Sequence, residues 1–146
     1  MSQAAPDDEG DDADDGDGVD ADDVDEVDAA LERGNRAYEA GAFEAAASAY
    51  EDAVRALRPD DDARAADLFE NLGITYWRLG RWRPAIRAFL RALDGDPGAR
   101  EQSLRLLVSC LFRDGLALDG ERLLGAYVAR FGPHPEGWAR APGPAD

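Results

Sequence analysis

Apolar side chains recur every three or four residues through most of this chain, with polar residues between them. This spacing places the apolar residues on one face of an α-helix. No stretch alternates residue by residue as a strand would. We therefore predict an all-α fold, with helices around five apolar groups: Phe43, Ala46, Ala47, Tyr50, Ala53, Val54 and Leu57; Leu68, Phe69, Leu72, Gly73, Tyr76 and Leu79; Trp82, Ala85, Ile86, Phe89 and Leu93; Leu104, Leu107, Val108 and Leu111; Leu123, Leu124, Tyr127, Val128 and Phe131.

Residues that form turns separate these groups. Gly41, Gly80 and Gly115 stand where a residue in the left-handed conformation ends a helix, and glycine adopts that conformation without strain. Asp96 followed by Pro97 has the pattern of an N-cap and a first helical residue. We therefore expect a helix to begin there.

Two stretches of the chain repeat each other. Residues 32–46 align with residues 71–85, and the match continues beyond them. Gly34 and Gly73 are 39 positions apart, and we expect the residues added between the copies, around residues 57–64, to lengthen a helix or a loop. The aligned pairs are Gly34 with Gly73, Gly41 with Gly80, Phe43 with Trp82, Ala46 with Ala85, Tyr50 with Phe89, Ala53 with Ala92, and Val54 with Leu93.

The second copy resembles the tetratricopeptide repeat, a helix-turn-helix unit of 34 residues. Its eight signature positions hold Phe69, Leu72, Gly73, Tyr76, Ala85, Phe89, Ala92 and Pro97. The first copy matches at Gly34, Ala46, Tyr50 and Ala53, and departs from the pattern at Ala30 and Arg33. A third, degenerate copy keeps Leu104, Leu107, Leu111, Gly115 and Leu124, but has Val108, Gly120 and Tyr127 at signature places.

The resemblance implies a right-handed α-solenoid of about three hairpins, in units near residues 27–60, 66–99 and 100–132. Small residues would let paired helices approach closely, and aromatic residues would fill the spaces between hairpins. The expected packing residues are Gly34, Ala46, Tyr50, Ala53, Leu72, Gly73, Tyr76, Ala85, Phe89, Ala92 and Pro97.

Composition divides the chain into three parts. Residues 1–29 hold fourteen of the 32 acidic residues and no base, which accounts for most of the formal net charge of −16. This segment has too few apolar side chains to offset roughly 1–2 kcal/mol per residue of backbone ordering. We therefore expect a disordered acidic tail at residues 1–28, a folded domain at residues 29–132 and a Pro-rich tail at residues 133–146.

The sequence predicts no catalytic or metal site. Cys110 is the only cysteine and is expected in the core, while His134 is the only histidine and is expected at the surface. Neither has partners at metal-ligand spacing, and no phosphate-binding loop is present. We expect a non-enzymatic, cytoplasmic protein that needs no cofactor. No apolar run could span a membrane, and the nearly neutral folded part disfavours nucleic acid as a partner.

The resemblance implies a binding surface on the first helix of each hairpin, the concave face of a solenoid. Tyr38, Trp77 and Phe112 hold equivalent positions and would form a ladder of rings beside arginines. These rings could instead pack between hairpins. The candidate groove residues are Asn35, Tyr38, Asn71, Ile74, Trp77, Arg78, Arg105, Ser109, Phe112 and Arg113.

Three functions fit these features. The first is a scaffold or adaptor that holds a peptide segment of another protein in the groove. The second is a small chaperone for a client protein, similar in size and architecture to secretion chaperones. The third is a weak phosphate or nucleic-acid ligand on the stripe of Arg83, Arg87 and Arg91, which could also be a solvated outer face. The partner and the oligomeric state are not predicted.

Overall fold

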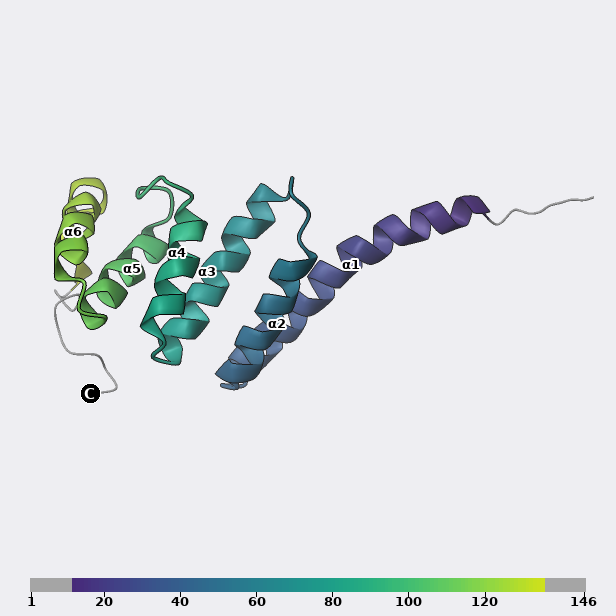
Figure 1. Cartoon of the computed structure of the whole chain (residues 1–146), viewed down its shortest axis with the longest axis horizontal. Helices are drawn as coiled ribbons and strands as arrows, with labels where there is room; N and C mark the ends of the chain where they lie inside the picture. The colour runs from purple at the N-terminus through teal and green to yellow at the C-terminus, as the bar shows by residue number, and fades with distance from the viewer. Residues whose placement is uncertain (1–11, 136–146) are drawn as a thin grey trace, which may run out of the picture.

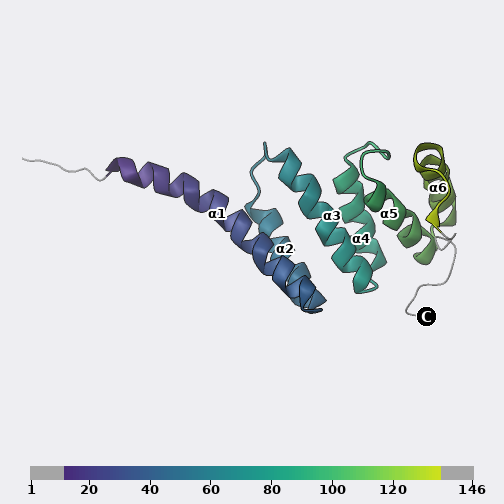
Figure 2. The ribbon, with the colours of Figure 1, turned by 180° about the vertical axis from the view of Figure 1, so that it is seen from behind.

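Six α-helices follow one another in the computed structural model, which describes residues 12–135, with side chains from residue 26 onward. They form three hairpins that stand side by side along the molecule (Figures 1 and 2). Residues 12–135 contain no strand, so the predicted all-α class is confirmed. The helices are α1 (Asp12–Glu39), α2 (Phe43–Ala56), α3 (Asp62–Arg78), α4 (Trp82–Leu93), α5 (Glu101–Arg113) and α6 (Ala117–Phe131).

All three hairpins turn in the same way. Gly41, Gly80 and Gly115 have φ values of 79°, 74° and 83°, which confirms the predicted left-handed glycines. In each turn the glycine amide donates to the carbonyl three residues earlier, and the next amide donates to the carbonyl five residues before itself. These two bonds define the Schellman motif. The second bonds run from Ala42 to Ala37, Arg81 to Tyr76, and Leu116 to Leu111, at 2.8, 3.0 and 2.8 Å.

Within the first two hairpins, a glycine on the first helix lies under an aromatic ring of the second. A Cβ atom at Gly34 would lie 2.5 Å from the Tyr50 ring, and one at Gly73 would lie 2.6 Å from the Phe89 ring. No side chain fits there, because real Cβ atoms do not approach a ring so closely. These glycines therefore set the distance between the helices of each pair.

The third hairpin reverses this arrangement. Its glycine, Gly120, is on the second helix, and a Cβ atom there would lie 3.0 Å from the Phe112 ring of the first helix. Phe112 therefore fills the space between α5 and α6. The buried residues form two clusters, one from α1 to α4 and one from α4 to α6, and Tyr76 packs against both.

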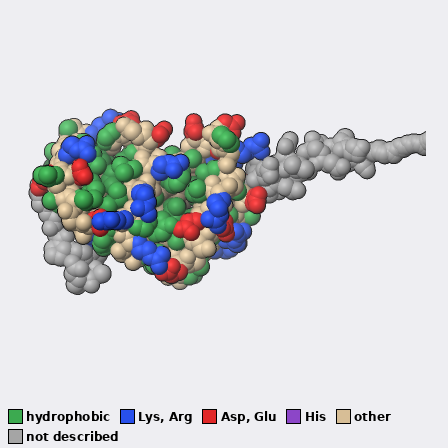
Figure 3. Space-filling view, viewed as in Figure 1, with side chains coloured by type: hydrophobic (Ala, Val, Ile, Leu, Met, Phe, Trp, Pro, Cys, Tyr) green, Lys and Arg blue, Asp and Glu red, His purple; other side chains and the backbone are tan. Residues whose placement is uncertain are grey.

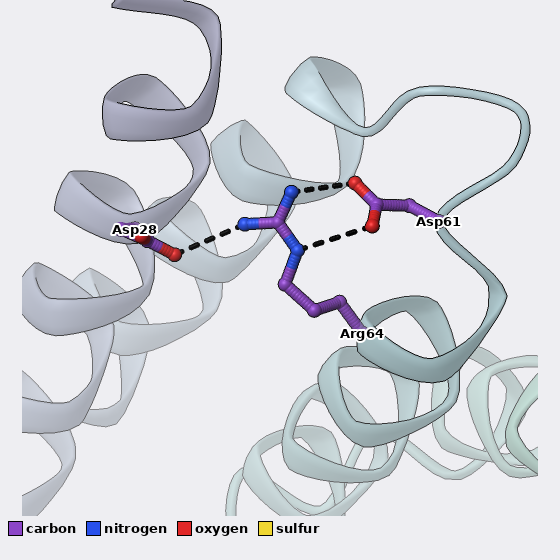
Figure 4. A network of polar contacts seen from close by, with 3 residues as sticks. All are labelled: Asp28, Asp61 and Arg64. Carbon is purple, nitrogen blue, oxygen red and sulfur yellow. Dashed lines mark hydrogen bonds and ion pairs between the residues drawn. The ribbon is translucent and has the colours of Figure 1, made fainter. Parts of the chain in front are cut away.

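Residues 57–64 form the connection between α2 and α3 and the first turn of α3, and α2, with 14 residues, is also longer than α4, with 12. Arg64, in that first turn, pairs with Asp61 at 2.5 Å and with Asp28 of α1 at 3.0 Å (Figure 4). Arg64 thus links the start of α3, in the second hairpin, to α1 in the first. The side-chain bond from Arg64 lowers the pKa of the Asp61 carboxyl.

The first helix extends into the acidic segment. α1 begins at Asp12, whereas the folded part was expected to begin at residue 29. Val27 is only 1% exposed and Asp28 is held by Arg64, so the packed domain includes residues on the tail side of the predicted boundary. Once a helix is anchored, each added residue gains a backbone bond. Residues 1–11 lie outside the described part of the chain.

The connection between α4 and α5 differs from the prediction. Asp96 does not begin a helix, since α5 begins at Glu101. The Asp96 carboxylate instead accepts a bond from the Gly98 amide at 3.0 Å, which closes a local turn. Pro97 is exposed, so it does not pack between hairpins.

His134, which follows α6, packs against the third hairpin. This residue was expected at the surface, but it is only 7% exposed. Its ring lies 5.0 Å from the Tyr127 ring, and its Nε2 atom lies 3.4 Å from the carbonyl oxygen of Arg105. The start of the predicted Pro-rich tail therefore packs on α5 and α6, and residues 136–146 lie outside the described part.

Candidate functional site

A cavity of about 270 Å³ opens across the first helices of all three hairpins. Residues from α1, α3 and α5 line it, and one residue of α2 forms part of its wall. Four of the predicted groove residues meet here. The lining residues are Asn35, Tyr38 and Glu39 of α1, Tyr50 of α2, Asn71 and Ile74 of α3, and Gln102 of α5.

The amide of Asn35 is oriented by Tyr50. The Tyr50 hydroxyl donates to the Asn35 Oδ1 atom at 2.6 Å. Because the oxygen is thus occupied, the Asn35 NH₂ group remains as a donor for a ligand. Burial raises the pKa of Tyr50, and nearby Tyr38 and Glu39 raise it further, so the hydroxyl keeps its proton and continues to donate.

Two further amides are free to bind a ligand. Within residues 26–135, the side-chain amides of Asn71 and Gln102 form no hydrogen bond. Asn71 is half-buried and Gln102 is exposed. Ile74, also half-buried, lies beside them in the cavity wall. The cavity thus combines amide groups that can donate and accept with a limited apolar surface, a combination that suits the backbone and side chains of a peptide.

Beside the turns that join the two helices of a hairpin, arginines lie over pairs of aromatic rings. The Arg78 guanidinium carbon lies 5.9 Å from the Tyr38 ring and 5.5 Å from the Phe43 ring, and Arg78 Nε donates to the Tyr38 hydroxyl at 3.2 Å. Arg78 belongs to the second hairpin and these rings to the first. This arginine therefore stacks consecutive hairpins by cation–π contact.

The same contact recurs one unit later. The Arg113 guanidinium carbon lies 6.0 Å from the Trp77 ring and 5.1 Å from the Trp82 ring. Trp77 and Trp82 follow Tyr38 and Phe43 at the 39-residue offset of the repeat. Trp77, Arg78 and Arg113, which were predicted in the groove, thus have packing contacts between hairpins.

Three predicted groove residues belong to the third hairpin's own packing. Ser109 is 0% exposed and Phe112 packs against Gly120 of α6. Arg105 pairs with Glu101 at 2.9 Å, and Glu101 also accepts a bond from the Tyr127 hydroxyl at 2.5 Å. Burial opposes ionisation of Glu101, but the bonds from Tyr127 and Arg105 prevail and lower its pKa.

The predicted groove did not include Tyr50, which lines the cavity, or Phe43 and Trp82, whose rings contact the arginines. Phe43 and Trp82 carried a signal, since the repeat aligns them at the start of the second helices. Tyr50 carried the opposite signal, since its repeat position indicates packing alone. Only the structure shows that its hydroxyl also reaches Asn35.

The described residues offer little for covalent chemistry. Burial raises the pKa of the Cys110 thiol to about 12, so it stays protonated at neutral pH. Among residues with described side chains, no group of three or more His, Cys, Asp or Glu is placed to hold a metal ion. None of the helices in this part of the chain combines the length and apolar character that crossing a membrane requires.

Stacked helical hairpins with a groove on their first helices define a helical-repeat protein. Residues 68–101 match the tetratricopeptide-repeat family model, and this match covers α3 from residue 68 onward, all of α4 and the first residue of α5. No curated protein matches the sequence. The chain thus contains a tetratricopeptide repeat. This repeat is a protein–protein interaction module and typically a non-enzymatic scaffold.

Proposed function

We propose that this protein is a scaffold or adaptor that holds a peptide segment of a partner protein across its first helices. The row of amides from Asn35, Asn71 and Gln102 around one cavity carries the proposal. These side chains come from three successive hairpins, so one extended segment could contact all of them. Two of the amides have no bond within the described protein, and a polar group left without a partner on binding would weaken the complex.

The experiment uses the full chain as bait in an affinity purification, followed by titration of the segment that binds. The double variant Asn71→Ala with Gln102→Ala removes both free amides and should fold normally, since neither side chain supports the domain. We expect it to bind the partner segment more weakly by about 1–3 kcal/mol.

Arg122→Ala is the matched control, because Arg122 is exposed on α6 and pairs with Asp119 of the same helix. This control should bind like the unchanged protein. Unchanged affinity in the double variant would exclude the cavity as the binding surface. A captured protein that aggregates without this chain, and stays dispersed with it, would favour the chaperone alternative.

A further inference from the structure

A second hollow, of about 240 Å³, lies on α3 and α4 and shares no residue with the first. Phe69, Leu72 and Tyr76 of α3 and Pro84 and Ala88 of α4 give it apolar and aromatic walls. Arg87 and Arg91 of α4 complete its lining. In the view of Figure 3, apolar side chains occupy much of the middle of the body, with basic side chains among them. Because the chain contains no lysine, those basic side chains are arginines.

The arginines of the stripe on α4 have different roles. Arg83 pairs with Asp114 at 3.0 Å and so joins α4 to the end of α5. Arg91 lies over the Phe69 ring, with its guanidinium carbon 4.4 Å from the ring centre. Arg87 is exposed and forms no ion pair with any residue from 26 to 135. Two of the three cations thus remain available to an anion, both of them at the second hollow.

A carboxylate of α2 contacts the tyrosine of the hollow. Glu51 of α2 accepts a hydrogen bond from the Tyr76 hydroxyl. Burial and this bond raise the pKa of Tyr76 to about 12. Arg87 and Arg91 are one helical turn apart, so they present two positive charges to one side of a ligand.

The size and chemistry of the hollow favour a protein ligand. It is smaller than the roughly 300–1,000 Å³ of typical small-molecule pockets, but it can take a side-chain anchor. Its apolar walls offer nothing to a free phosphate, whose oxygens all need partners. A peptide can place an apolar side chain in the hollow and carboxylates beside the arginines, which form strong charge-assisted bonds with them.

We propose that this hollow binds an acidic amphipathic segment of a second partner protein. One apolar side chain of that segment enters between Leu72, Pro84 and Ala88, and flanking carboxylates pair with Arg87 and Arg91. The charge complementarity guides the encounter, while the apolar anchor selects this ligand over other anions. The protein then has two binding surfaces, one along its first helices and one on α3 and α4.

The test measures fluorescence anisotropy of a labelled helical peptide of about sixteen residues with the full chain. The peptide carries one central leucine, with glutamates three and four residues to either side, in an alanine background. The double variant Arg87→Ala with Arg91→Ala should weaken binding at least about tenfold. Arg122→Ala, which removes an exposed arginine from α6, should leave the affinity unchanged.

Two further ligands distinguish this proposal from general anion binding. A peptide with serine in place of the leucine should bind at least about fivefold more weakly. A single-stranded oligonucleotide of equal charge should bind more weakly than the leucine peptide and lose affinity more steeply with salt. The proposal is overturned if the leucine peptide does not bind, if the arginine double variant binds it normally, or if the serine peptide or oligonucleotide binds equally well.

Discussion

Gly34 and Gly73 contribute to the fold through the side chain they lack. Each lies directly beneath an aromatic ring. A Cβ atom added at Gly34 would lie 2.5 Å from the Tyr50 ring, and one at Gly73 would lie 2.6 Å from the Phe89 ring. The ring cannot move away easily, because Tyr50 and Phe89 are both buried in the core. Each pair of helices can therefore pack this closely only because its glycine carries a hydrogen atom in place of a side chain.

Gly73→Ala should therefore lower the free energy of unfolding by about 1–3 kcal/mol, since the new methyl group must displace the Phe89 ring. Gly125→Ala is the matched control, because a methyl group at Gly125 of α6 would meet nothing within 4 Å beyond its chain neighbours and the adjacent backbone of its own helix. This control should raise stability by up to about 1 kcal/mol through helix propensity. Chemical denaturation of both variants measures the difference, and equal effects would contradict the close packing at Gly73.

Two tyrosine hydroxyls in part-buried positions donate to carboxylates. Tyr76 donates to Glu51 and Tyr127 donates to Glu101. Burial, together with these bonds, raises the pKa of each phenol to about 12. The unfolded phenols titrate near pH 10. The folded state therefore keeps these protons more firmly than the unfolded state does.

This difference predicts a loss of stability in alkali. The contribution of both phenols is fully present below about pH 10 and is lost as the pH rises through about 12. Denaturation midpoints at about pH 9 and pH 11 measure it, with phenolate absorbance as a direct record of titration. Tyr127→Phe should show a smaller decline over this range. A decline as large as that of the unchanged protein would assign the effect to other groups.

At the scale of helices, arginines join consecutive hairpins at both ends. Arg64 reaches Asp28, and Arg100, just before α5, reaches Asp67 at 2.6 Å and Glu70 at 3.1 Å. Asp28 and Asp67 are 39 positions apart, the offset of the repeat. At the turn end, Arg78 and Arg113 stack on the rings of the preceding hairpin. The second and third hairpins are thus each attached to the preceding hairpin by arginines at both ends.

Arg64→Gln tests the attachment of α1. The ion pair with Asp28 is partly exposed, so global stability should fall by less than about 1 kcal/mol. Amide exchange in α1 near Val27 should nevertheless become up to about fivefold faster, because this turn loses its link to α3. Arg122→Gln, which breaks an ion pair within α6, should leave α1 unchanged. Equal exchange in α1 for both variants would show that Arg64 does not hold it.

The sequence was sufficient for the elements that depend on local chemistry. The apolar period and the three left-handed glycines identify α2 to α6 and the hairpin turns, because each depends on residues close together in the chain. The start of α1 has no comparable signal, since acidic residues surround the few apolar ones there. Asp96 was assigned to a helix because an Asx turn and an N-cap look alike in sequence.

The candidate groove shows where local chemistry does not suffice. Asn71 and Ile74, which the repeat places on the expected groove face, line the cavity. Ser109 does not, because it is fully buried, and Phe112 does not, because its ring packs against Gly120 of the second helix. His134 is buried only through contact with Tyr127 and Arg105, and no spacing in the sequence indicates that contact.

At the scale of the molecule, helices pack chiefly against their neighbours in the sequence. The contacts run from α1 to α2 and onward to α6, with an added contact between α3 and α5. The second hairpin is therefore covered on both sides, while each outer hairpin is covered on one. In such arrays, stability is approximately the sum of the units and of the interfaces between them.

Amide exchange should follow this arrangement. We expect the slowest exchange in α3 and α4 and faster exchange toward the start of α1 and the end of α6, because the outer hairpins can open without disturbing the centre. Mass spectrometry of the full chain over minutes to hours measures the gradient. Uniform protection across all six helices would indicate that the hairpins open as one cooperative unit.

The packing of sequence neighbours also bears on how quickly the chain can reach this structure. Its contacts close short loops, so little chain entropy is lost before each contact forms. A hairpin can form from its own glycine turn and then serve as a surface for the next, without waiting for a distant segment to arrive. Helical proteins with such local contacts fold within about microseconds to milliseconds. The apolar faces of the hairpins are therefore exposed only briefly while the chain folds.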